Sequence, residues 1–262
     1  MAVTPELSIV IPAYNEESRL ERTLRDMVRY CRRTSRVVEI IVVDDGSRDG
    51  TSAVVQRLGG ELPELRLLRL ARNHGKGYAV RSGVVNAHGA RVLFADADGA
   101  TPVEELERLE AALTGGADVA IGSRALAAAG VTVKARWHRR AIGRTFHLLV
   151  ETLTVRGYRD TQCGFKLFRG PVAQELFSRM RMSGFSFDVE VLVMAGLLGY
   201  RVAEVPVNWS HVPGSRVNLA ADSLRMARDL FLIRGNALRG EYRRPHIAPR
   251  ASDPAMPVAA RH

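Results

Sequence analysis

Residues 37–47 of this 262-residue chain read Val-Val-Glu-Ile-Ile-Val-Val-Asp-Asp-Gly-Ser. The stretch from Val37 to Val43 is rich in β-branched residues, which is typical of a strand that is buried on both faces. It ends at Asp44-Asp45-Gly46-Ser47, whose residue types favour a loop. The stretch therefore predicts an inner strand of a parallel sheet that is followed at once by an acidic loop.

Strand-like and helix-like patterns alternate on both sides of this stretch. Between Glu16 and Arg33, apolar side chains recur at the spacing of a helix. Further strands are expected at 7–11, 65–70, 91–95 and 119–122, and further helices at 51–58, 76–87 and 102–113. Such alternation with short links implies an α/β fold, in which helices flank a mostly parallel central sheet.

The second half of the chain is less regular. Helices are expected at 134–155, 171–180, 187–198 and 221–238, and strands at the end of 160–168 and at 202–207. The first and last of these helices are basic and amphipathic. We expect a single domain over residues 1–240 and a disordered tail over 241–262, where Pro, Ala and Arg accumulate.

The net charge of +10 is unevenly distributed. Residues 1–123 carry 16 basic and 18 acidic groups, whereas residues 124–169 carry 10 basic and 2 acidic groups. Residues 216–262 are basic again, with 9 basic and 4 acidic groups. This distribution predicts a localised anionic partner. Because aromatic residues make up only 6% of the chain and no nucleic-acid-binding motif is recognisable, we expect no nucleic-acid partner.

Cysteine spacing and hydropathy exclude several other classes. The two cysteines lie far apart, and the histidines lack the paired spacing of a zinc site. No signal peptide is recognisable, and no apolar run approaches the roughly 18–20 residues that span a bilayer. We therefore expect a cytoplasmic protein that stays in solution or lies on a membrane without crossing it.

Three polar clusters directly follow predicted strands. They are Pro12-Ala13-Tyr14-Asn15-Glu16, Asp44-Asp45-Gly46-Ser47 and Asp96-Ala97-Asp98. In an open parallel sheet, the carboxyl ends of the strands form the ligand crevice. The carboxylates of these clusters would repel one another there unless a cation binds. Mg²⁺ or Mn²⁺ carrying a diphosphate is the simplest such cation.

Each cluster also has a purely structural interpretation. Asp-Asp-Gly-Ser alone fits a turn with a helix N-cap, and a lone Asp-x-Asp fits a solvated loop. The occurrence of all three clusters in order, each after a buried strand, favours a functional site.

Together these motifs resemble family 2 of the inverting glycosyltransferases, which have the GT-A fold. The first half contributes Ile9-Val-Ile-Pro-Ala-Tyr-Asn-Glu16, Val42-Val-Asp-Asp-Gly-Ser47, Asn73-His-Gly-Lys-Gly77 and Asp96-Ala-Asp98. The second half resembles the dolichyl-phosphate β-glucosyltransferase branch through Gly122-Ser-Arg124, Arg159-Asp-Thr-Gln-Cys-Gly-Phe-Lys-Leu-Phe168, Phe187-Asp-Val-Glu190 and Glu204-Val-Pro-Val-Asn-Trp209. The resemblance extends over residues 7–235.

The resemblance implies a metal-dependent, inverting transfer of glucose from UDP-glucose to a dolichyl-type polyprenyl phosphate. It implies Mg²⁺ or Mn²⁺ as the cofactor. It also implies a nucleotide-sugar-binding half at 1–123 and an acceptor and membrane-facing half at 124–240. The continuation of Asp98 into Gly99-Ala100-Thr101-Pro102 resembles the glucosyl branch rather than the mannosyl relatives.

On the donor side, the resemblance assigns residues to the nucleotide and its diphosphate. They are Pro12, Ala13, Tyr14 and Glu16 beside base and ribose, Asp44 or Asp45 as hydrogen-bond acceptors, Lys76 as a brace, and Asp96, Ala97 and Asp98 at the diphosphate. Asp96 is expected to contact ribose or metal, and Asp98 to bind the metal. Lys76 also fits a solvated lysine at a helix start.

On the acceptor side, a lipid phosphate is already anionic at neutral pH and needs no general base. The chain must instead hold two anions together, and arginine binds phosphate bidentately while staying charged. We expect Arg124 to bind the acceptor phosphate, with Arg136 and Lys166 as further candidates. The resemblance also places Asp160, Gln162 and Asp188 at the sugar or acceptor pocket, and Asp188 equally fits a helix cap.

The two basic amphipathic helices suit the surface of an anionic membrane. Helices docked on the domain with arginine outside fit the same pattern. We expect peripheral membrane association, because a polyprenyl substrate is reached from the bilayer.

Other functions also fit the sequence. One is a polyprenyl-phosphate mannosyltransferase that uses GDP-mannose, and another is a family 2 transferase with a different acceptor. A non-catalytic nucleotide-sugar-binding module is a third, although the intact Asp-Ala-Asp motif and Arg124 argue against it.

Overall fold

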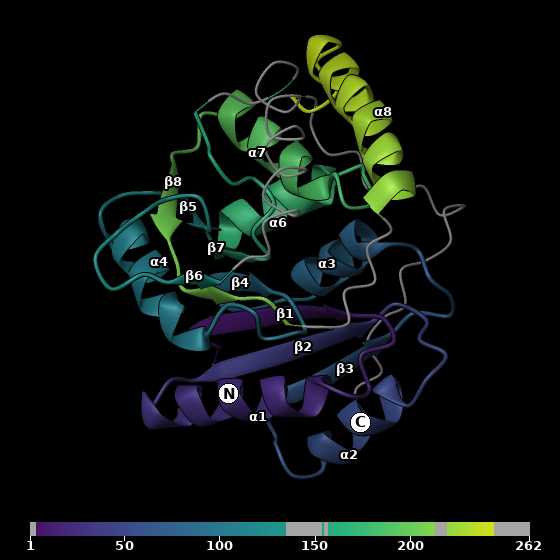
Figure 1. Cartoon of the computed structure of the whole chain (residues 1–262), viewed down its shortest axis with the longest axis vertical. Helices are drawn as coiled ribbons and strands as arrows, with labels where there is room; N and C mark the ends of the chain where they lie inside the picture. Colours follow the sequence, from purple (N-terminus) through teal and green to yellow (C-terminus); the bar gives the residue numbers. More distant parts are fainter. Residues whose placement is uncertain (1–3, 135–153, 155–156, 213–218, 244–262) are drawn as a thin grey trace.

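The computed structural model describes residues 4–134, 154, 157–212 and 219–243, and shows helices on both faces of a central sheet (Figure 1). The sheet has seven strands in the order β3-β2-β1-β4-β7-β5-β8. These strands are β1 (Leu7–Ala13), β2 (Val38–Asp44), β3 (Leu65–Arg69), β4 (Arg91–Ala95), β5 (Val119–Ser123), β7 (Phe165–Arg169) and β8 (Val202–Pro206). The expected strands of the first half are all present.

The sheet is mostly parallel, as the sequence predicts. β1 pairs in parallel with both β2 and β4, β2 with β3, and β5 with β8. Strand β7 is the exception, because it runs antiparallel to both of its neighbours, β4 and β5. The carboxyl ends of β1, β2 and β4 therefore meet at one edge of the sheet, where the three polar clusters begin.

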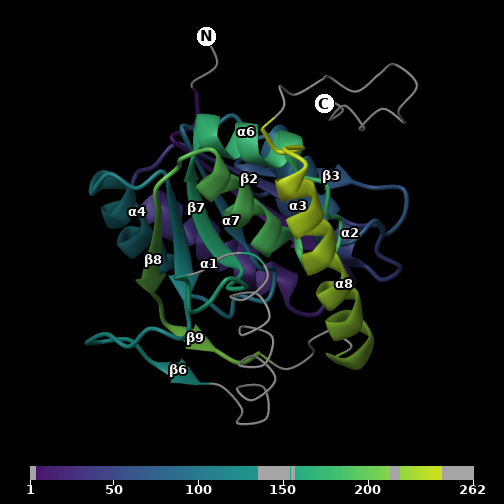
Figure 2. The same ribbon diagram turned by 90° about the horizontal axis from the view of Figure 1, so that it is seen from above.

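The helices divide between the two faces. Helices α1 (Leu20–Arg33), α2 (Thr51–Gly59) and α4 (Leu106–Thr114), with the 3₁₀ turn η1 (Val103–Glu105), pack on one face. Helices α3 (Lys76–Val85), α6 (Gly170–Arg179) and α7 (Phe187–Leu197) pack on the other. Helix α8 (Leu219–Leu238) lies against α7 at the outside of this second layer (Figure 2).

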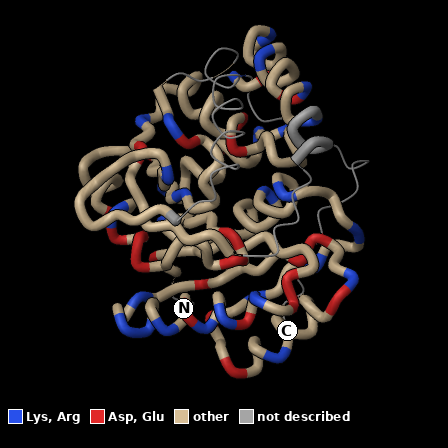
Figure 3. The backbone as a smooth tube through the Cα atoms, viewed as in Figure 1, with Lys and Arg blue, Asp and Glu red and all other residues tan. Residues whose placement is uncertain are grey.

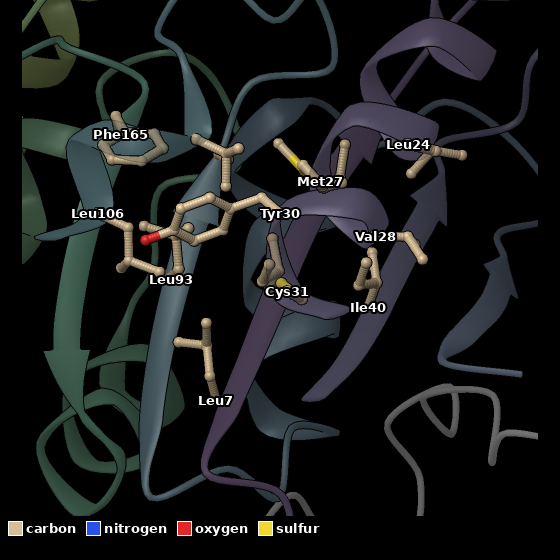
Figure 4. Packing of buried hydrophobic residues seen from close by; sticks show 14 of the residues in the cluster. Leu7, Leu24, Met27, Val28, Tyr30, Cys31, Ile40, Leu93, Leu106 and Phe165 are labelled. Atoms are coloured by element: carbon tan, nitrogen blue, oxygen red, sulfur yellow. The ribbon is translucent and has the colours of Figure 1, made fainter. Parts of the chain in front are cut away.

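Strand β1 shows how one apolar run serves both layers. Successive side chains of a strand point to opposite faces. Leu7 and Ile9 accordingly join the cluster under α1, whereas Val10 joins the cluster under α3. Figure 4 shows the first cluster, in which Tyr30 and Met27 of α1 pack among residues of the strands. The sheet is thus buried on both sides, which explains the continuous apolar runs in the sequence.

Helix α1 carries five arginines and two acidic residues, and neighbouring elements supply carboxylate partners for some of these arginines. Both basic and acidic residues lie along α1, at the bottom of Figure 3. Arg25 bonds to Glu21 at 2.9 Å, and Arg29 bonds to Asp26 at 2.7 Å. These ion pairs compensate part of the positive charge of α1 locally.

The second half of the chain differs from the sequence-based expectation at both ends of the predicted helical region. The predicted basic helix 134–155 falls almost entirely outside the described residues, and its first residue, Lys134, belongs instead to a short strand. That strand, β6 (Val133–Lys134), pairs in parallel with β9 (Trp209–Ser210). Of the predicted disordered tail 241–262, residues 241–243 are ordered, because Tyr242 is fully buried and Glu241 pairs with Arg181, and the remaining residues lie outside the described ranges. No helix in the described part of the chain is long and apolar enough to span a membrane.

Candidate active site

A pocket of about 670 Å³ opens at the edge of the sheet where β1, β2 and β4 end. Six segments of the chain contribute its lining. They supply Pro12, Ala13, Tyr14, Glu16 and Arg19; Asp45; Asn73, Gly75, Lys76 and Ala79; Asp96, Ala97 and Asp98; Gly184 and Phe185; and Arg225, Met226, Arg228 and Asp229. Nine of the residues that the sequence assigns to the donor or the metal lie in this one pocket.

The two aspartates at the end of β2 have different surroundings. Asp44 is fully buried and accepts hydrogen bonds from the Ser47 N–H at 2.8 Å and from the Ser52 hydroxyl. Asp45 lines the pocket, and its two oxygens accept the backbone N–H groups of His74 and Gly75, each at 2.8 Å. Burial raises the pKa of Asp45 above its ordinary value. Asp44 thus holds its own loop, whereas Asp45 fixes the turn that opens α3.

The loop after β1 is held in place by its neighbours across the pocket. The N–H of Glu16 donates to the Thr51 hydroxyl at 2.8 Å, and the Glu16 carboxylate pairs with Arg19, whose Nη2 lies 2.7 Å from Oε1. This hydrogen bond is the main reason that the pKa of Arg19 is raised. Arg19 was not among the predicted site residues, although its position three residues after Glu16 on one turn was a usable signal.

Lys76 and the Asp96-Ala97-Asp98 motif form the charged centre of the pocket. Lys76 Nζ lies 2.7 Å from Asp96 Oδ1, and its ammonium also lies 5.3 Å from the centre of the Phe94 ring. Burial acts to lower the pKa of Lys76, but nearby carboxylates, with Asp96 the strongest, outweigh it and the pKa is raised. Lys76 therefore stays charged and braces Asp96 rather than extending into solvent.

Asp98 is the less compensated of the two carboxylates. Its Oδ1 accepts the Ala100 N–H at 3.0 Å, and it forms no ion pair with any residue in the described ranges. Burial, followed by the charge of Asp96, raises its pKa. Two neighbouring carboxylates in one pocket present hard oxygen ligands, which suit Mg²⁺ or Mn²⁺.

This donor set fits a divalent cation only if further ligands come from the substrate. Within the described residues, no group of three or more His, Cys, Asp or Glu side chains is arranged to hold a metal by itself. Asp96 and Asp98 leave positions that diphosphate oxygens can fill, as is common for Mg²⁺ sites. The residues thus fit a metal that is shared with a nucleoside diphosphate.

Gly164 lets the backbone of the second half pack directly against Asp96. The Asp96 N–H donates to the Gly164 carbonyl at 2.9 Å. A Cβ at position 164 would lie only 2.0 Å from Asp96 Oδ2. The segment before β7 therefore defines where the Asp96 carboxylate can lie.

Lys166 and Asp188 form a buried ion pair behind the pocket. Lys166 Nζ lies 2.5 Å from Asp188 Oδ1 and 2.6 Å from the Cys163 carbonyl, and the Lys166 side chain is 1% exposed. Burial raises the pKa of Asp188. Neither residue lines the pocket, so the structure places these two predicted site residues outside its lining.

Arg124 and Asp160 form a second pair beside the pocket. Arg124 donates to Asp160 through Nε at 2.6 Å and Nη2 at 2.8 Å, and its backbone N–H donates at 2.9 Å. Burial opposes ionisation of Asp160, but Arg124 outweighs it and the pKa of Asp160 is lowered. The guanidinium also lies 5.7 Å from the centre of the Trp209 ring, and the Gln162 N–H donates to Asp160 at 3.2 Å.

Three of the predicted acceptor-side residues meet at this second pair. Arg124, Asp160 and Gln162 are brought together, as expected, but outside the pocket lining. Trp209 had been noted only as part of a motif, and its contact with Arg124 depends on tertiary structure. Arg136 lies outside the described residues.

Helix α8 forms the outer wall of the pocket. It contributes Arg225, Met226, Arg228 and Asp229, none of which the sequence analysis had assigned to the site. The Ser186 hydroxyl donates to Asp229 at 2.9 Å and so fixes α8 to the start of α7. The pocket is therefore completed by an element more than 120 residues away from the Asp-Ala-Asp motif.

The chain is similar to known glycosyltransferases. The profile of the family described as "Glycosyl transferase family 2" matches residues 8–177. Dolichyl-phosphate β-glucosyltransferase from Mus musculus is 39% identical over 92% of this chain and 78% of the relative. The enzymes of that name from Drosophila melanogaster and Saccharomyces cerevisiae are 40% and 37% identical, over 91% and 90% of this chain and 77% and 76% of the relatives.

Solved structures resemble the fold at lower sequence identity. Glucosyl-3-phosphoglycerate synthase from Mycobacterium tuberculosis, crystallised with Mn²⁺, UDP and glucosyl-3-phosphoglycerate, matches with a TM-score of 0.67 and 20% identity, over 88% of this chain and 80% of that one. Mannosyl-3-phosphoglycerate synthase from Rubrobacter xylanophilus matches with a TM-score of 0.64 and 19% identity, over 95% and 79% of the two chains. These matches show the GT-A fold. The family profile and the curated relatives together show that the chain belongs to glycosyltransferase family 2.

Proposed function

We propose that the protein transfers glucose from UDP-glucose to a polyprenyl phosphate with inversion, giving a β-linked lipid phosphoglucose. Relatives that are 37–40% identical over about nine-tenths of the chain are dolichyl-phosphate β-glucosyltransferases. The observation that carries the proposal is the pocket in which Asp96 and Asp98 face the loop after β1 and Lys76. This arrangement suits a nucleoside diphosphate bound through a metal.

Asp96 and Asp98 would hold the divalent cation. When bound, this cation supplies Lewis-acid stabilisation of the charge on the departing diphosphate. Lys76 holds Asp96 in place through their 2.7 Å ion pair. Arg19 and Lys76 add positive charge around the diphosphate, while the loop from Pro12 to Glu16 is placed to receive the nucleoside.

The transfer itself needs little proton chemistry. An acceptor phosphate oxygen forms a bond to the anomeric carbon of glucose as the bond from that carbon to the UDP oxygen breaks. A single in-line displacement of this kind inverts the anomeric configuration. Because the acceptor phosphate is already ionised, the chain has to position it rather than deprotonate it. Asp160 orients Arg124 for this purpose through a bidentate hydrogen-bonded pair.

The proposal also includes peripheral association with an anionic membrane. A polyprenyl chain resides in a bilayer, so its phosphate must be met at the bilayer surface. The net charge of +10 and its concentration after residue 123 favour contact with anionic lipids. Flotation with liposomes that contain or lack anionic lipids tests this part, and equal recovery with both kinds would contradict it.

A panel of donors and acceptors tests the transfer reaction. UDP-glucose and GDP-mannose are each combined with polyprenyl phosphate or 3-phosphoglycerate, with Mn²⁺ or with a chelator. We expect product only from UDP-glucose, polyprenyl phosphate and Mn²⁺ together. Product from GDP-mannose alone, or from 3-phosphoglycerate alone, would refute the proposed donor or acceptor.

A further inference from the structure

Tyr242 is fully buried, although it lies four residues beyond the end of helix α8. Its hydroxyl donates to Oε1 of Glu190 at 2.8 Å. Its carbonyl accepts a hydrogen bond from Arg179 Nη1 at 3.0 Å. One hydrogen bond through the side chain and one through the backbone therefore fix Tyr242 in the interior, where the sequence predicted a disordered tail.

Glu190 connects Tyr242 to the 181–185 segment, which precedes helix α7. The Glu190 side chain is fully buried, and its carboxyl group accepts the backbone N–H of Arg181 at 3.0 Å and that of Met182 at 2.8 Å. Two later residues of the same segment line the pocket. One carboxyl group thus bonds both the buried end of the described chain and the backbone that leads to the pocket.

The 181–185 segment also packs against the turn that opens α3. The Tyr78 N–H donates to the Ser183 carbonyl at 3.2 Å. A Cβ at Gly75 would lie 2.5 Å from the same carbonyl oxygen, so the two backbones are in direct contact. Lys76 is the next residue, and it pairs with Asp96 at 2.7 Å. The backbone that carries Lys76 therefore depends on the position of the 181–185 segment.

We propose that Tyr242 is a positioning residue for the transfer reaction. It does not line the pocket, but through Glu190 it holds the 181–185 segment in the arrangement that binds the nucleoside diphosphate. If only a fraction of the molecules has this arrangement, the apparent affinity for the ligand falls by that fraction. The inference rests on the proposed function for the identity of the ligand, whereas the order of the segment can be measured without any ligand.

A second buried tyrosine separates positioning from a purely structural role. Tyr30 is 2% exposed, and its hydroxyl also donates to a carboxylate, that of Glu107, at 3.1 Å. It lies in the cluster on the other face of the sheet and does not line the pocket. Phenylalanine at either position removes one hydroxyl and keeps the ring. Both variants should therefore lose some stability, but only Tyr242→Phe should loosen the 181–185 segment.

Hydrogen exchange followed by mass spectrometry measures the order of this segment in the full chain without ligand. The N–H groups of Met182 and Tyr78 are protected by the hydrogen bonds to Glu190 and Ser183. We expect peptides that contain these two groups to exchange about tenfold faster in Tyr242→Phe, because local opening becomes more frequent. The same peptides should exchange at the wild-type rate in Tyr30→Phe.

Titration calorimetry with UDP and Mn²⁺ measures the consequence for binding. We expect Tyr242→Phe to weaken UDP binding about tenfold, which corresponds to about 1.4 kcal/mol, and Tyr30→Phe to bind UDP as the wild type does. In transfer assays, the KM for UDP-glucose should rise in Tyr242→Phe while the KM for polyprenyl phosphate stays constant. Glu190→Ala should show the same loss, and Glu190→Gln should recover most of it because its amide oxygen still accepts backbone N–H groups.

Two results would overturn the proposal. One is UDP binding in Tyr242→Phe within twofold of the wild type, whatever its exchange rates. The other is an equal loss in Tyr30→Phe, which would mean that binding follows the overall stability rather than the position of the segment. A wild type that binds GDP but not UDP would instead refute the proposed donor alone, and the same variants would then be compared with GDP.

Discussion

The contact between Gly164 and Asp96 allows a steric test of the site. Gly164→Ala adds one methyl group at a place where the backbone passes the Asp96 carboxylate. Its Cβ would lie 2.0 Å from Asp96 Oδ2 and 2.2 Å from Cγ, whereas ordinary contact begins near 3.4 Å. The backbones are held together by the hydrogen bond from the Asp96 N–H to the Gly164 carbonyl. The Asp96 side chain must therefore retreat by about 1.4 Å.

A displacement of the Asp96 side chain by this distance should lower activity while leaving the stability of the fold almost unchanged. A short side chain at the edge of a pocket can rotate away, so we expect the variant to fold with little change in thermal unfolding. Asp96 would, however, leave its 2.7 Å contact with Lys76 and its place beside Asp98. Misplacing a reacting group by about 1 Å can lower the rate about 100-fold. We therefore expect a loss of about two orders of magnitude in kcat.

The assay measures kcat with UDP-glucose and polyprenyl phosphate, together with Mn²⁺ affinity in the presence of UDP. Gly196→Ala is the control, because a Cβ at this position in α7 meets nothing within 4 Å. That variant should retain wild-type kcat. A folded Gly164→Ala protein with kcat within threefold of the wild type and unchanged Mn²⁺ affinity would refute the reasoning that Asp96 must occupy this place.

Three further predictions address charged side chains in the pocket and in the protein interior. Asp98→Asn keeps an acceptor for the Ala100 N–H but removes the charge, so Mn²⁺ binding measured with UDP should be lost while the fold persists, and retained binding would exclude Asp98 as a ligand. Lys166→Met leaves Asp188 buried without its partner, and urea unfolding should show a loss of about 3–5 kcal/mol; a loss below about 1 kcal/mol would contradict this. Burial raises the pKa of Glu190 above its ordinary 4.5, so its stabilising contribution is full below that value and is lost as pH rises through the raised pKa. Unfolding between pH 4 and 7 should therefore show wild-type stability falling relative to Glu190→Gln, and parallel curves would argue against it.

The strands and the order of the site motifs could be predicted from local sequence. Runs such as Val37–Val43 have few conformations open to them besides a buried strand. The carboxyl ends of parallel strands converge by geometry, so Asp45, Asp96 and Asp98 were correctly expected near one another. The contribution of α8 to the pocket depended on tertiary contacts that no local pattern records.

The surroundings of individual charged side chains could not be predicted from the sequence. Asp44 and Asp45 are adjacent and chemically identical. Asp44 is nevertheless fully buried and accepts a hydrogen bond from its own loop, whereas Asp45 lines the pocket. Lys166 was expected at the acceptor phosphate as a basic residue in a recognised motif. Its position on β7 turns it into the interior, where Asp188 neutralises it. Both outcomes follow from side-chain direction, which changes from one residue to the next.

The place of β7 in the sheet has a consequence for how the chain is made. Strand β5 pairs only with β7 and β8 within the described sheet, and β7 also covers the open side of β4. When only residues 1–123 have left the ribosome, β5 therefore lacks both of its neighbours. Strand β4 then has one unpaired edge, the edge that β7 later covers. Unpaired strand edges can pair with other chains and aggregate before their native partner strands are synthesised. Native pairing of β5 must be delayed until residues 165–169 emerge, so we expect the nascent first half to depend on chaperones and to fail as a separately expressed fragment.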